Sequence, residues 1–513
     1  MKASTLTKRL LSIIAIMLAV VMVFSGCGEG DKGDSSDLSG TTANTDEQKD
    51  ADVEDGEDAD EKDGDKKDDK KDKNTSKKTT SKKTTSKKTS SKTTGGSTGN
   101  TKFAKDPYSE ITAELKGKEV HVLMWRKYTK SEQQQVDAFQ KKTGIKVRTT
   151  VTTEQEYSTK LVSLISAKDS PDALCISSGY FPGTALKSMQ PLDEKKFRLN
   201  DDCWYTEYMD NYAVNGKYYA VCMRGIWSCE DCNYVTYYSP KVLKECGVTT
   251  MPYDLYKAGK WNWQTQLDII NKVKQNGAAK SYVPFSTQSA DLSMLACGVD
   301  FADYDGKKYT NNLTDVKSGS LIAKSWEYIA DINKNIGGIA LWDLNNCQQG
   351  KVGLFTAIAY GLYNNGAWFD NMSGGYGSDN LQAVPVAAES QSNSYTPVRP
   401  KAWGVAKNAK NPEGAAFFLR YYLDVNTVQG GMSSTFYNKQ FEEVYNIITA
   451  KSTKKRLRVG SGVADYITAK TYDGICQKLT TSTKENVLTV LKSNATKLNT
   501  GINKANRDIA KKS

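Results

Sequence analysis

Residues 118–151, KEVHVLMWRKYTKSEQQQVDAFQKKTGIKVRTTV, contain the pattern that decides the fold. The run 119–125 is short, apolar and rich in branched side chains, which predicts a buried strand. Val136 and Phe139 are three residues apart, so they fall on one face of the helix expected next. Residues 146–152 alternate as a second strand does. The stretch therefore predicts strand, helix and strand in succession.

The following residues extend this alternation. Apolar side chains recur at helical spacing over 154–167, and DALCIS at 172–177 predicts a third strand. Right-handed crossovers between such strands give a parallel sheet, whose ligands bind beyond the carboxyl ends of the strands. The side chains expected there are Trp125, Arg126 and Tyr128 after the first strand, and Ser178 and Tyr180 after the third.

The N-terminus has the form of an export signal. A basic tip precedes the apolar run 10–24, which is short for a membrane-spanning helix. Two small residues then precede Cys27, an arrangement that resembles the lipobox of bacterial lipoproteins, although Phe24 stands where leucine is usual. We expect residues 1–26 to be a lipoprotein signal peptide and Cys27 to carry the lipid. An ordinary secretory signal and an uncleaved anchor are the alternatives, and all three place the rest of the chain outside the cytoplasm.

Residues 27–102 are expected to be a disordered linker. They contain no Trp, Tyr, Ile or Met, and they pass from an acidic stretch at 46–72 into SKKTT repeats at 76 and 81. Such a segment buries too little apolar surface to offset its conformational entropy. A solvated spacer is the favoured interpretation, and contact of its lysine-rich half with anionic cell-wall polymers or lipid headgroups is the alternative.

The region from about residue 117 to the C-terminus resembles the extracellular solute-binding proteins of the sugar-binding type, which serve ABC importers. The opening stretch is similar to theirs, and further segments follow in the family's order: VNGKYYAVCMR (214–224), YVTYYSPKVLKECGV (234–248), KWNWQTQLDIINKVK (260–274), DYDGKKYT (303–310), GKVGLFTAIAYGLYN (350–364), LQAVPVA (381–387) and WGVAKNAKNPEGAAFFLRYYLD (403–424). No single segment is specific, but the ordered series is.

This resemblance implies a two-lobed α/β fold of the periplasmic-binding-protein kind, with a ligand cleft between lobes that crossing segments join. We expect the two-lobed domain to span 103–513. Its first lobe would take about 117–230 and 395–455, and its second about 235–390 and 460–513. The pair Asn411–Pro412 independently predicts a helix start. An apolar stripe from Val487 to Ile509 predicts a packed C-terminal helix.

A sugar site combines aromatic platforms with planar polar side chains, because sugars have apolar C–H faces and rings of hydroxyl groups. Besides the strand-end residues above, large aromatic or basic side chains follow the family-like segments at both lobes. We expect Arg224, Trp227, Tyr360, Trp368 and Trp403 to contact the ligand. Core packing is the alternative for each aromatic residue, and a surface ion pair is the alternative for each arginine.

The residue inventory argues against several other functions. The only histidine, His121, lies inside the first expected strand, so a Ser-His-Asp or Cys-His site would need a buried residue. We expect a core histidine, no metal and no cofactor. From residue 101 onward, 52 Lys and Arg residues exceed 40 Asp and Glu residues, and this excess is dispersed, without an arginine-rich helix or a zinc-finger pattern, so we expect no nucleic-acid binding. A carbohydrate-active enzyme needs only two carboxylates, and composition leaves that alternative open.

The cysteines leave three interpretations open. Nine follow Cys27, and four of them cluster near the expected crossing into the second lobe: Cys222, Cys229, Cys232 and Cys246. Free buried thiols are the favoured interpretation. A disulfide within the cluster is one alternative, and a zinc site is the other, although the spacing lacks paired C-x₂-C motifs.

We therefore expect a monomeric receptor, lipid-anchored at the extracellular face of the membrane, that has no catalytic activity. It would capture a sugar or oligosaccharide and present it to the permease of an ABC transporter. A receptor for a peptide, a polyamine or an amino acid derivative is the alternative within the binding class. A surface adhesion or sensory module is the alternative outside it.

Overall fold

The structure, a computed structural model, describes residues 106–128, 130–153, 156–177, 181–201, 203–222, 233–287, 290–336, 346–347, 349–362, 381–399, 401–423, 436–460, 462–463 and 471–512. These residues belong to one compact unit that runs from Ser97 to Ser513. The signal peptide, Cys27 and the linker lie outside the described residues, so our expectations for them stay predictions.

The first sheet contains the three strands that the opening stretch and its continuation predict. Its strands follow the order β2-β1-β3-β15-β4, and β7 also pairs with β15. Their bounds are β1 Glu119–Met124, β2 Lys146–Val151, β3 Ala173–Ser177, β4 Met189–Gln190, β7 Ala220–Val221 and β15 Lys401–Ala406. β1 pairs in parallel with β2 and with β3, which confirms the predicted parallel arrangement. β15 returns antiparallel to β3.

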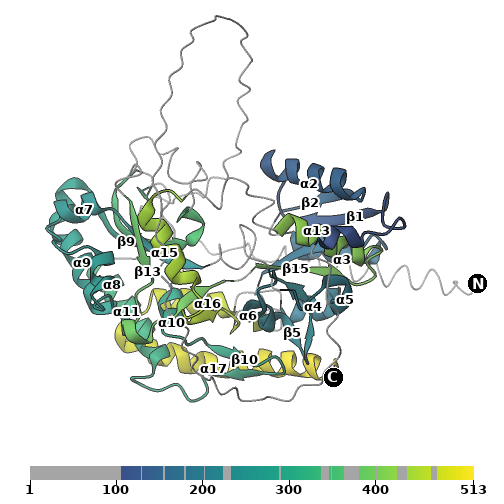
Figure 1. Ribbon diagram of the computed structural model, residues 1–513. Helices are drawn as coiled ribbons and strands as arrows, with labels where there is room; N and C mark the ends of the chain where they lie inside the picture. Colours follow the sequence, from purple (N-terminus) through teal and green to yellow (C-terminus); the bar gives the residue numbers. More distant parts are fainter. Residues whose placement is uncertain are drawn as a thin grey trace, which may run out of the picture. The chain divides into compact units, whose positions relative to one another are not determined.

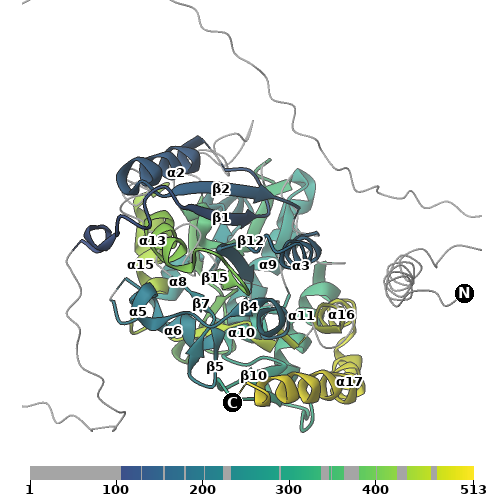
Figure 2. The same ribbon diagram turned by 90° about the vertical axis from the view of Figure 1, so that its right-hand side faces the viewer.

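Helices cover both faces of this sheet. Figure 2 shows α2 (Lys130–Thr143) and α13 (Pro412–Leu423) on one side of β1, and α3 (Tyr157–Ser166) on the other side. Phe139 of α2 packs edge-on against Phe418 of α13, with ring centroids 5.5 Å apart. Asn411 caps α13 through its Oδ1, which accepts the Gly414 N–H at 2.9 Å. The sequence predicted this helix start.

The second sheet follows the order β13-β8-β12-β9. Its strands are β8 Tyr234–Tyr238, β9 Val283–Thr287, β12 Val352–Ile358 and β13 Gln382–Pro385, and its helices include α7 Pro240–Glu245, α8 Pro252–Lys257, α9 Trp263–Gly277 and α15 Lys439–Thr449. Tyr237 and Phe355 stack on neighbouring strands. Gln440 of α15 exchanges hydrogen bonds with the backbone of Ala383, so this helix lies against the second sheet, although its residues fall in the range expected for the first lobe.

The chain passes between the two sheets three times. It leaves the first sheet after β7, returns through β14 (Thr396–Val398) into β15, and leaves again after α13. Asn233 forms a bridge with Val398, and β14 pairs in parallel with β16 (Lys455–Leu457). Arg399 and Arg458 follow these two strands, and both donate to the fully buried Asp291, at 2.9 and 2.6 Å. A buried ionic cluster therefore holds the crossing strands together.

Helices at the C-terminus complete this unit. α17 (Lys484–Ala510) buries the predicted stripe, including Val487, Leu491, Leu498, Ile502 and Ile509, which confirms its packing role. It contacts α11 (Leu321–Ile336) and α16 (Thr471–Thr480), and Figure 1 shows it running along the base of the fold.

The short elements are η1 Pro107–Glu110, α4 Gly183–Ser188, α5 Glu194–Phe197, α6 Thr206–Met209, η3 Asp210–Tyr212, β5 Ala213–Val214, β6 Lys217–Tyr218, η4 Ala278–Lys280, α10 Leu292–Ala296, β10 Ala302–Tyr304, β11 Tyr309–Asn311, η5 Ala359–Leu362 and η6 Gln391–Asn393.

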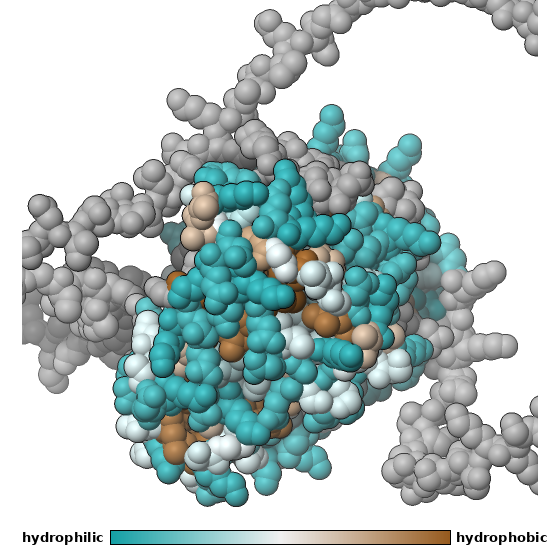
Figure 3. Space-filling view, turned by 90° about the vertical axis from the view of Figure 1, so that its left-hand side faces the viewer, coloured by the Kyte–Doolittle hydropathy of each residue, from teal (hydrophilic) through white to brown (hydrophobic). Residues whose placement is uncertain are grey.

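The outer face of the second sheet's helices is mainly hydrophilic. Figure 3 shows this face, where hydrophobic residues form small separate patches. Within the described part of the chain, no helix combines the length and the apolarity needed to cross a membrane.

Buried titratable groups agree with two expectations. His121 is 2% exposed, which confirms the core histidine, and burial together with the charge of Arg148 lowers its pKa. Cys222 and Cys246, the two described members of the cysteine cluster, are free thiols and both are buried. Cys229 and Cys232 lie outside the described residues, so a bridge between those two stays untested.

Candidate functional site

An aromatic cluster lies where β1 ends. Trp125 follows the last residue of β1, and its ring lies 6.5 Å from that of Trp403 on β15. Trp403 in turn meets Tyr422 of α13 edge-on at 5.6 Å. Trp403 is 1% exposed, whereas Trp125 is only partly buried. Trp125 is therefore the more exposed of the two rings, and Trp403 packs against it from within the fold.

The indole N–H of Trp403 is buried, and no described group accepts a hydrogen bond from it. A buried donor without an acceptor costs free energy, so such groups usually have an explanation in the structure. Because Trp403 is itself buried, this donor lies inside the packing around Trp125 rather than on the surface.

A bidentate salt bridge fixes Arg126 beside this cluster. Its Nη1 and Nη2 donate to the two carboxylate oxygens of Glu132, each at 2.7 Å. The hydroxyl of Tyr422 donates to Glu132 Oε1 at 3.3 Å, and Glu132 is 4% exposed. Burial lowers the pKa of Arg126, but the hydrogen bonds and charge of Glu132 outweigh it, and the net shift is upward. The guanidinium is therefore a fixed cation, with 29% of the side chain exposed.

Tyr128 extends the cluster toward β2. Its ring meets Tyr422 edge-on at 5.8 Å, and its hydroxyl accepts a hydrogen bond from Thr149 at 3.3 Å. Burial raises the pKa of Tyr128 to about 12, so it stays a neutral phenol. The ammonium of Lys401 lies 4.9 Å from the centre of the Trp125 ring. The end of the first sheet therefore combines aromatic rings with cationic groups.

Tyr360 brings the second sheet to this site. It lies in η5, directly after β12, and is half-buried. Tyr360 is close enough to Arg126 to contribute to the upward shift of its pKa. The structure thus brings together Trp125, Arg126, Tyr128, Tyr360 and Trp403 of the expected ligand residues. The other five, Ser178, Tyr180, Arg224, Trp227 and Trp368, lie outside the described residues.

The model of the bacterial extracellular solute-binding proteins matches residues 126–425, which is more than half of the chain. This chain belongs to that family. Among curated protein sequences we find no significant match.

Solved structures of similar fold share little sequence with this solute-binding protein. The galacto-N-biose/lacto-N-biose I-binding protein of a Bifidobacterium longum ABC transporter has a TM-score of 0.54 at 16% identity, and the likeness covers 75% of this chain and 98% of that one. The cyclic α-maltosyl-1,6-maltose binding protein of Arthrobacter globiformis has a TM-score of 0.54 at 13% identity, with 77% and 99% covered. A transporter-associated binding protein of B. animalis subsp. lactis, in complex with β-1,6-galactobiose, has a TM-score of 0.51 at 17% identity, with 73% and 96% covered. At such low identity the likeness shows the fold, which is two-lobed.

Sequence reasoning missed three residues of the solute-binding protein's candidate site. Glu132 lies six residues after Arg126, in the first turn of α2, and this spacing could have suggested the pair. In the sequence, Tyr422 is part of the apolar stripe of α13. No residue pattern near it predicts its contacts to Trp403, Tyr128 and Glu132. Lys401 likewise reaches Trp125 only through the pairing of distant strands.

The structure also separates this protein's packing residues from its site residues. Trp261, Trp263 and Trp326 are at most 8% exposed, so they pack in the core. Arg399 pairs with the buried Asp291 at the crossing strands. In the described part of the chain, no group of three or more His, Cys, Asp and Glu side chains could hold a metal ion.

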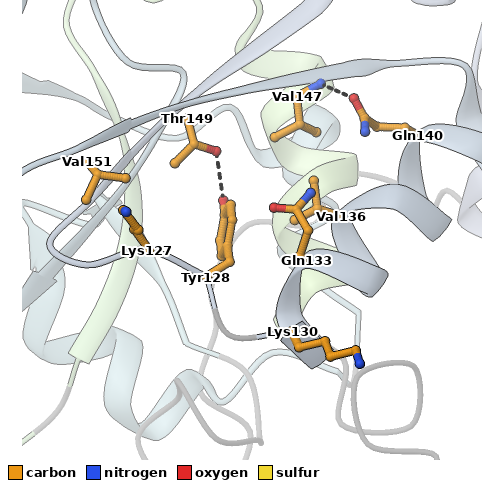
Figure 4. A pocket seen from close by; sticks show the side chains of 9 residues that line it. All are labelled: Lys127, Tyr128, Lys130, Gln133, Val136, Gln140, Val147, Thr149 and Val151. Atoms are coloured by element: carbon orange, nitrogen blue, oxygen red, sulfur yellow. Dashed lines mark hydrogen bonds between the residues drawn. The ribbon is translucent and has the colours of Figure 1, made fainter. Parts of the chain in front are cut away.

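A hollow of about 460 Å³ adjoins the aromatic cluster of the solute-binding protein. Figure 4 shows it between α2 and the edge strand β2. Its lining consists of Lys127, Tyr128, Lys130, Gln133, Val136, Gln140, Val147, Thr149 and Val151. Tyr128 is shared between this hollow, called here the β2-edge pocket, and the aromatic cluster.

Proposed function

We propose that this solute-binding protein captures a carbohydrate between its two lobes and delivers it to the permease of an ABC transporter. The observation that carries the proposal is the cluster at the end of β1, where the partly buried ring of Trp125 lies beside the fixed guanidinium of Arg126. An aromatic face packs against the C–H groups of a sugar, and a planar cation donates to its hydroxyl groups.

The second sheet would complete this site through Tyr360, and through Trp368, which follows it in the sequence. A sugar that contacts both lobes binds the closed form more tightly than the open one, and this difference in affinity shifts the population toward closure. Similar solved structures are described as binding lacto-N-biose, cyclic α-maltosyl-1,6-maltose and β-1,6-galactobiose, which supports the carbohydrate class.

The cationic surroundings argue against the polyamine alternative. Arg126 and Lys401 lie at the cluster, and the carboxylate of Glu132 is already engaged by Arg126. A polyamine site needs carboxylates that face the ligand, since amines bind by charge pairing. We therefore favour a solute rich in hydroxyl groups or other acceptors.

We further propose that the chain works as a monomer outside the cytoplasm. Signal peptide cleavage after residue 26 and lipidation of Cys27 would tether it to the outer face of the membrane, and residues 27–102 would act as a spacer. The two lobes would then occupy residues 103–513. Metabolic labelling with a lipid precursor tests the anchor, because Cys27→Ser should lose the label and appear in the medium.

A thermal-shift screen of the full chain tests the carbohydrate proposal. The panel contains mono- and oligosaccharides, amino acids, short peptides and polyamines. A ligand at about a hundred times its dissociation constant stabilises the fold by about 2.7 kcal/mol. We expect a saturable shift with one class of saccharide and no turnover of that saccharide. A shift with peptides alone would replace the solute class, and product release would restore the enzyme alternative.

A further inference from the structure

The β2-edge pocket begins two residues beyond Trp125, at Lys127. Its volume of about 460 Å³ falls within the range of small-molecule sites. Tyr128 forms one wall of this pocket and also packs against Tyr422, which packs against Trp403. Trp125 and Lys127 are two residues apart, which is at most about 7 Å of extended chain, so neighbouring units of one saccharide could reach both.

The edge strand supplies backbone donors to this pocket. Lys146 N–H donates to Lys118 and Thr152 N–H donates to Met124, so the even-numbered amides of β2 point toward β1. Because successive amides of a strand point in opposite directions, the N–H groups of Thr149 and Val151 point away from β1, on the pocket side. The third such amide, that of Val147, already donates to Gln140 Oε1 at 2.9 Å, as Figure 4 shows.

The charged side chains that line the pocket are all positive. Lys127 and Lys130 line it, both are exposed, and neither forms an ion pair with a described residue. The lining contains no carboxylate. Of the acids nearby on α2, Glu132 pairs with Arg126, and Asp137 accepts from the amide of Gln133 at 3.0 Å. The pocket therefore offers ammonium, amide and backbone donors, and its preferred ligand is an acceptor-rich anion.

We propose that the β2-edge pocket is a subsite for a sugar unit that carries a carboxylate, such as a uronic acid. This proposal rests on the proposed function and narrows its substrate class to acidic saccharides. The carboxylate would lie beside the ammonium of Lys127, which points toward β2 in Figure 4, while Lys130 adds positive charge at the rim of the pocket and the neighbouring unit packs on Trp125. The ring of Tyr128, a neutral phenol fixed by Thr149 and Tyr422, separates the two positions.

Calorimetric titration of the full chain with a matched pair of disaccharides tests the subsite. The pair is α-1,4-digalacturonate and α-1,4-galactobiose. At C6 of each unit the first has a carboxylate and the second has a hydroxymethyl group. We expect the acid to bind at least tenfold more tightly at low salt, with a preference that shrinks as the ionic strength rises. The double variant K127Q/K130Q should lose most of that preference while its affinity for galactobiose stays within twofold. The control Lys141→Gln, at the other end of α2, should retain the preference.

The outcomes separate this subsite from the proposed function. Equal affinity for the two disaccharides, or an equal loss of both in K127Q/K130Q, would overturn the subsite and leave carbohydrate binding intact. Failure of every saccharide in the thermal-shift panel would overturn the proposed function itself. Binding of the dipeptide Glu-Glu as tightly as digalacturonate would show an anion site that does not select saccharides, and would also overturn the proposal.

Discussion

Trp125 and Trp403 are neighbours in the structure but differ in exposure, and this difference predicts opposite behaviour on substitution. Trp125→Ala removes a partly buried ring, so we expect the fold to remain and the saccharide affinity to fall roughly tenfold, or about 1.4 kcal/mol. Trp403→Ala empties a buried position and should cost about 3–5 kcal/mol of unfolding free energy. Calorimetric titration measures the first effect and urea unfolding the second.

Tyr256→Ala is the control for Trp125→Ala. Tyr256 is also a half-buried aromatic residue, stacked on Tyr253 in α8 and away from the first sheet. It should leave the saccharide affinity unchanged. If Trp125→Ala also binds as the unchanged protein does, the site does not include the end of β1.

His121 should make the fold less stable in mild acid. Its pKa is lowered, by burial and then by the charge of Arg148, so the folded state binds fewer protons than the unfolded state, whose histidine titrates near 6.5. Neutral His121 therefore contributes fully to the unfolding free energy above pH 6.5, the pKa of the unfolded state. This contribution is lost as the pH falls from 6.5 toward the lowered pKa of the folded state. His121 is the only histidine, so a His121→Gln variant should show a smaller loss of unfolding free energy between pH 7 and pH 5.5. If the unchanged protein and His121→Gln lost the same unfolding free energy over this pH range, His121 would not be the cause of the loss.

The N-terminus of α13 offers a test at the scale of one element. Asn411 accepts the Gly414 N–H through Oδ1, so Asn411→Ala leaves that amide without its partner. We expect a loss of about 1 kcal/mol in unfolding free energy, within the range of about 0.5–2 for such caps. Asn411→Ser keeps an oxygen acceptor and should lose less. An equal loss in both variants would show that the cap is not the stabilising contact.

The elements were easier to predict than the contacts between them. The strands at 119–125, 146–152 and 172–177 and the start of α13 could be predicted because their signals are local: hydrophobic period, branched side chains and a capping residue. Glu132 and Tyr422 could not be predicted as a pair, because they lie 290 residues apart and meet only when α13 packs against α2. The family resemblance supplied the order of the lobes but no side-chain contact.

At the scale of the whole molecule, the chain depends on the cluster around Asp291. This carboxylate is fully buried and accepts from Arg399 and Arg458, which follow the crossing strands β14 and β16. Removing one partner of a buried ionic cluster leaves uncompensated charge and costs about 3–5 kcal/mol. We therefore expect Asp291→Ala to lower the unfolding free energy by that amount, as measured by urea unfolding.

Asp473 provides the matched control for this cluster. It also accepts from Arg458, at 2.7 Å, but its side chain is 70% exposed. Exposed ion pairs contribute at most about 1 kcal/mol, so Asp473→Ala should be nearly neutral. Similar losses in the two variants would mean that burial at the crossing strands does not govern the stability of this cluster.

Hydrogen exchange of the full chain, with and without the best saccharide of the panel, tests most directly whether a sugar binds between the two lobes. Peptides that cover Trp125–Tyr128 report on the end of β1, and peptides that cover Ala359–Leu362 report on the end of β12. We predict that the saccharide slows exchange in both segments at once. Slower exchange in only one of them, or none in either at saturating saccharide, would contradict a site that both lobes share.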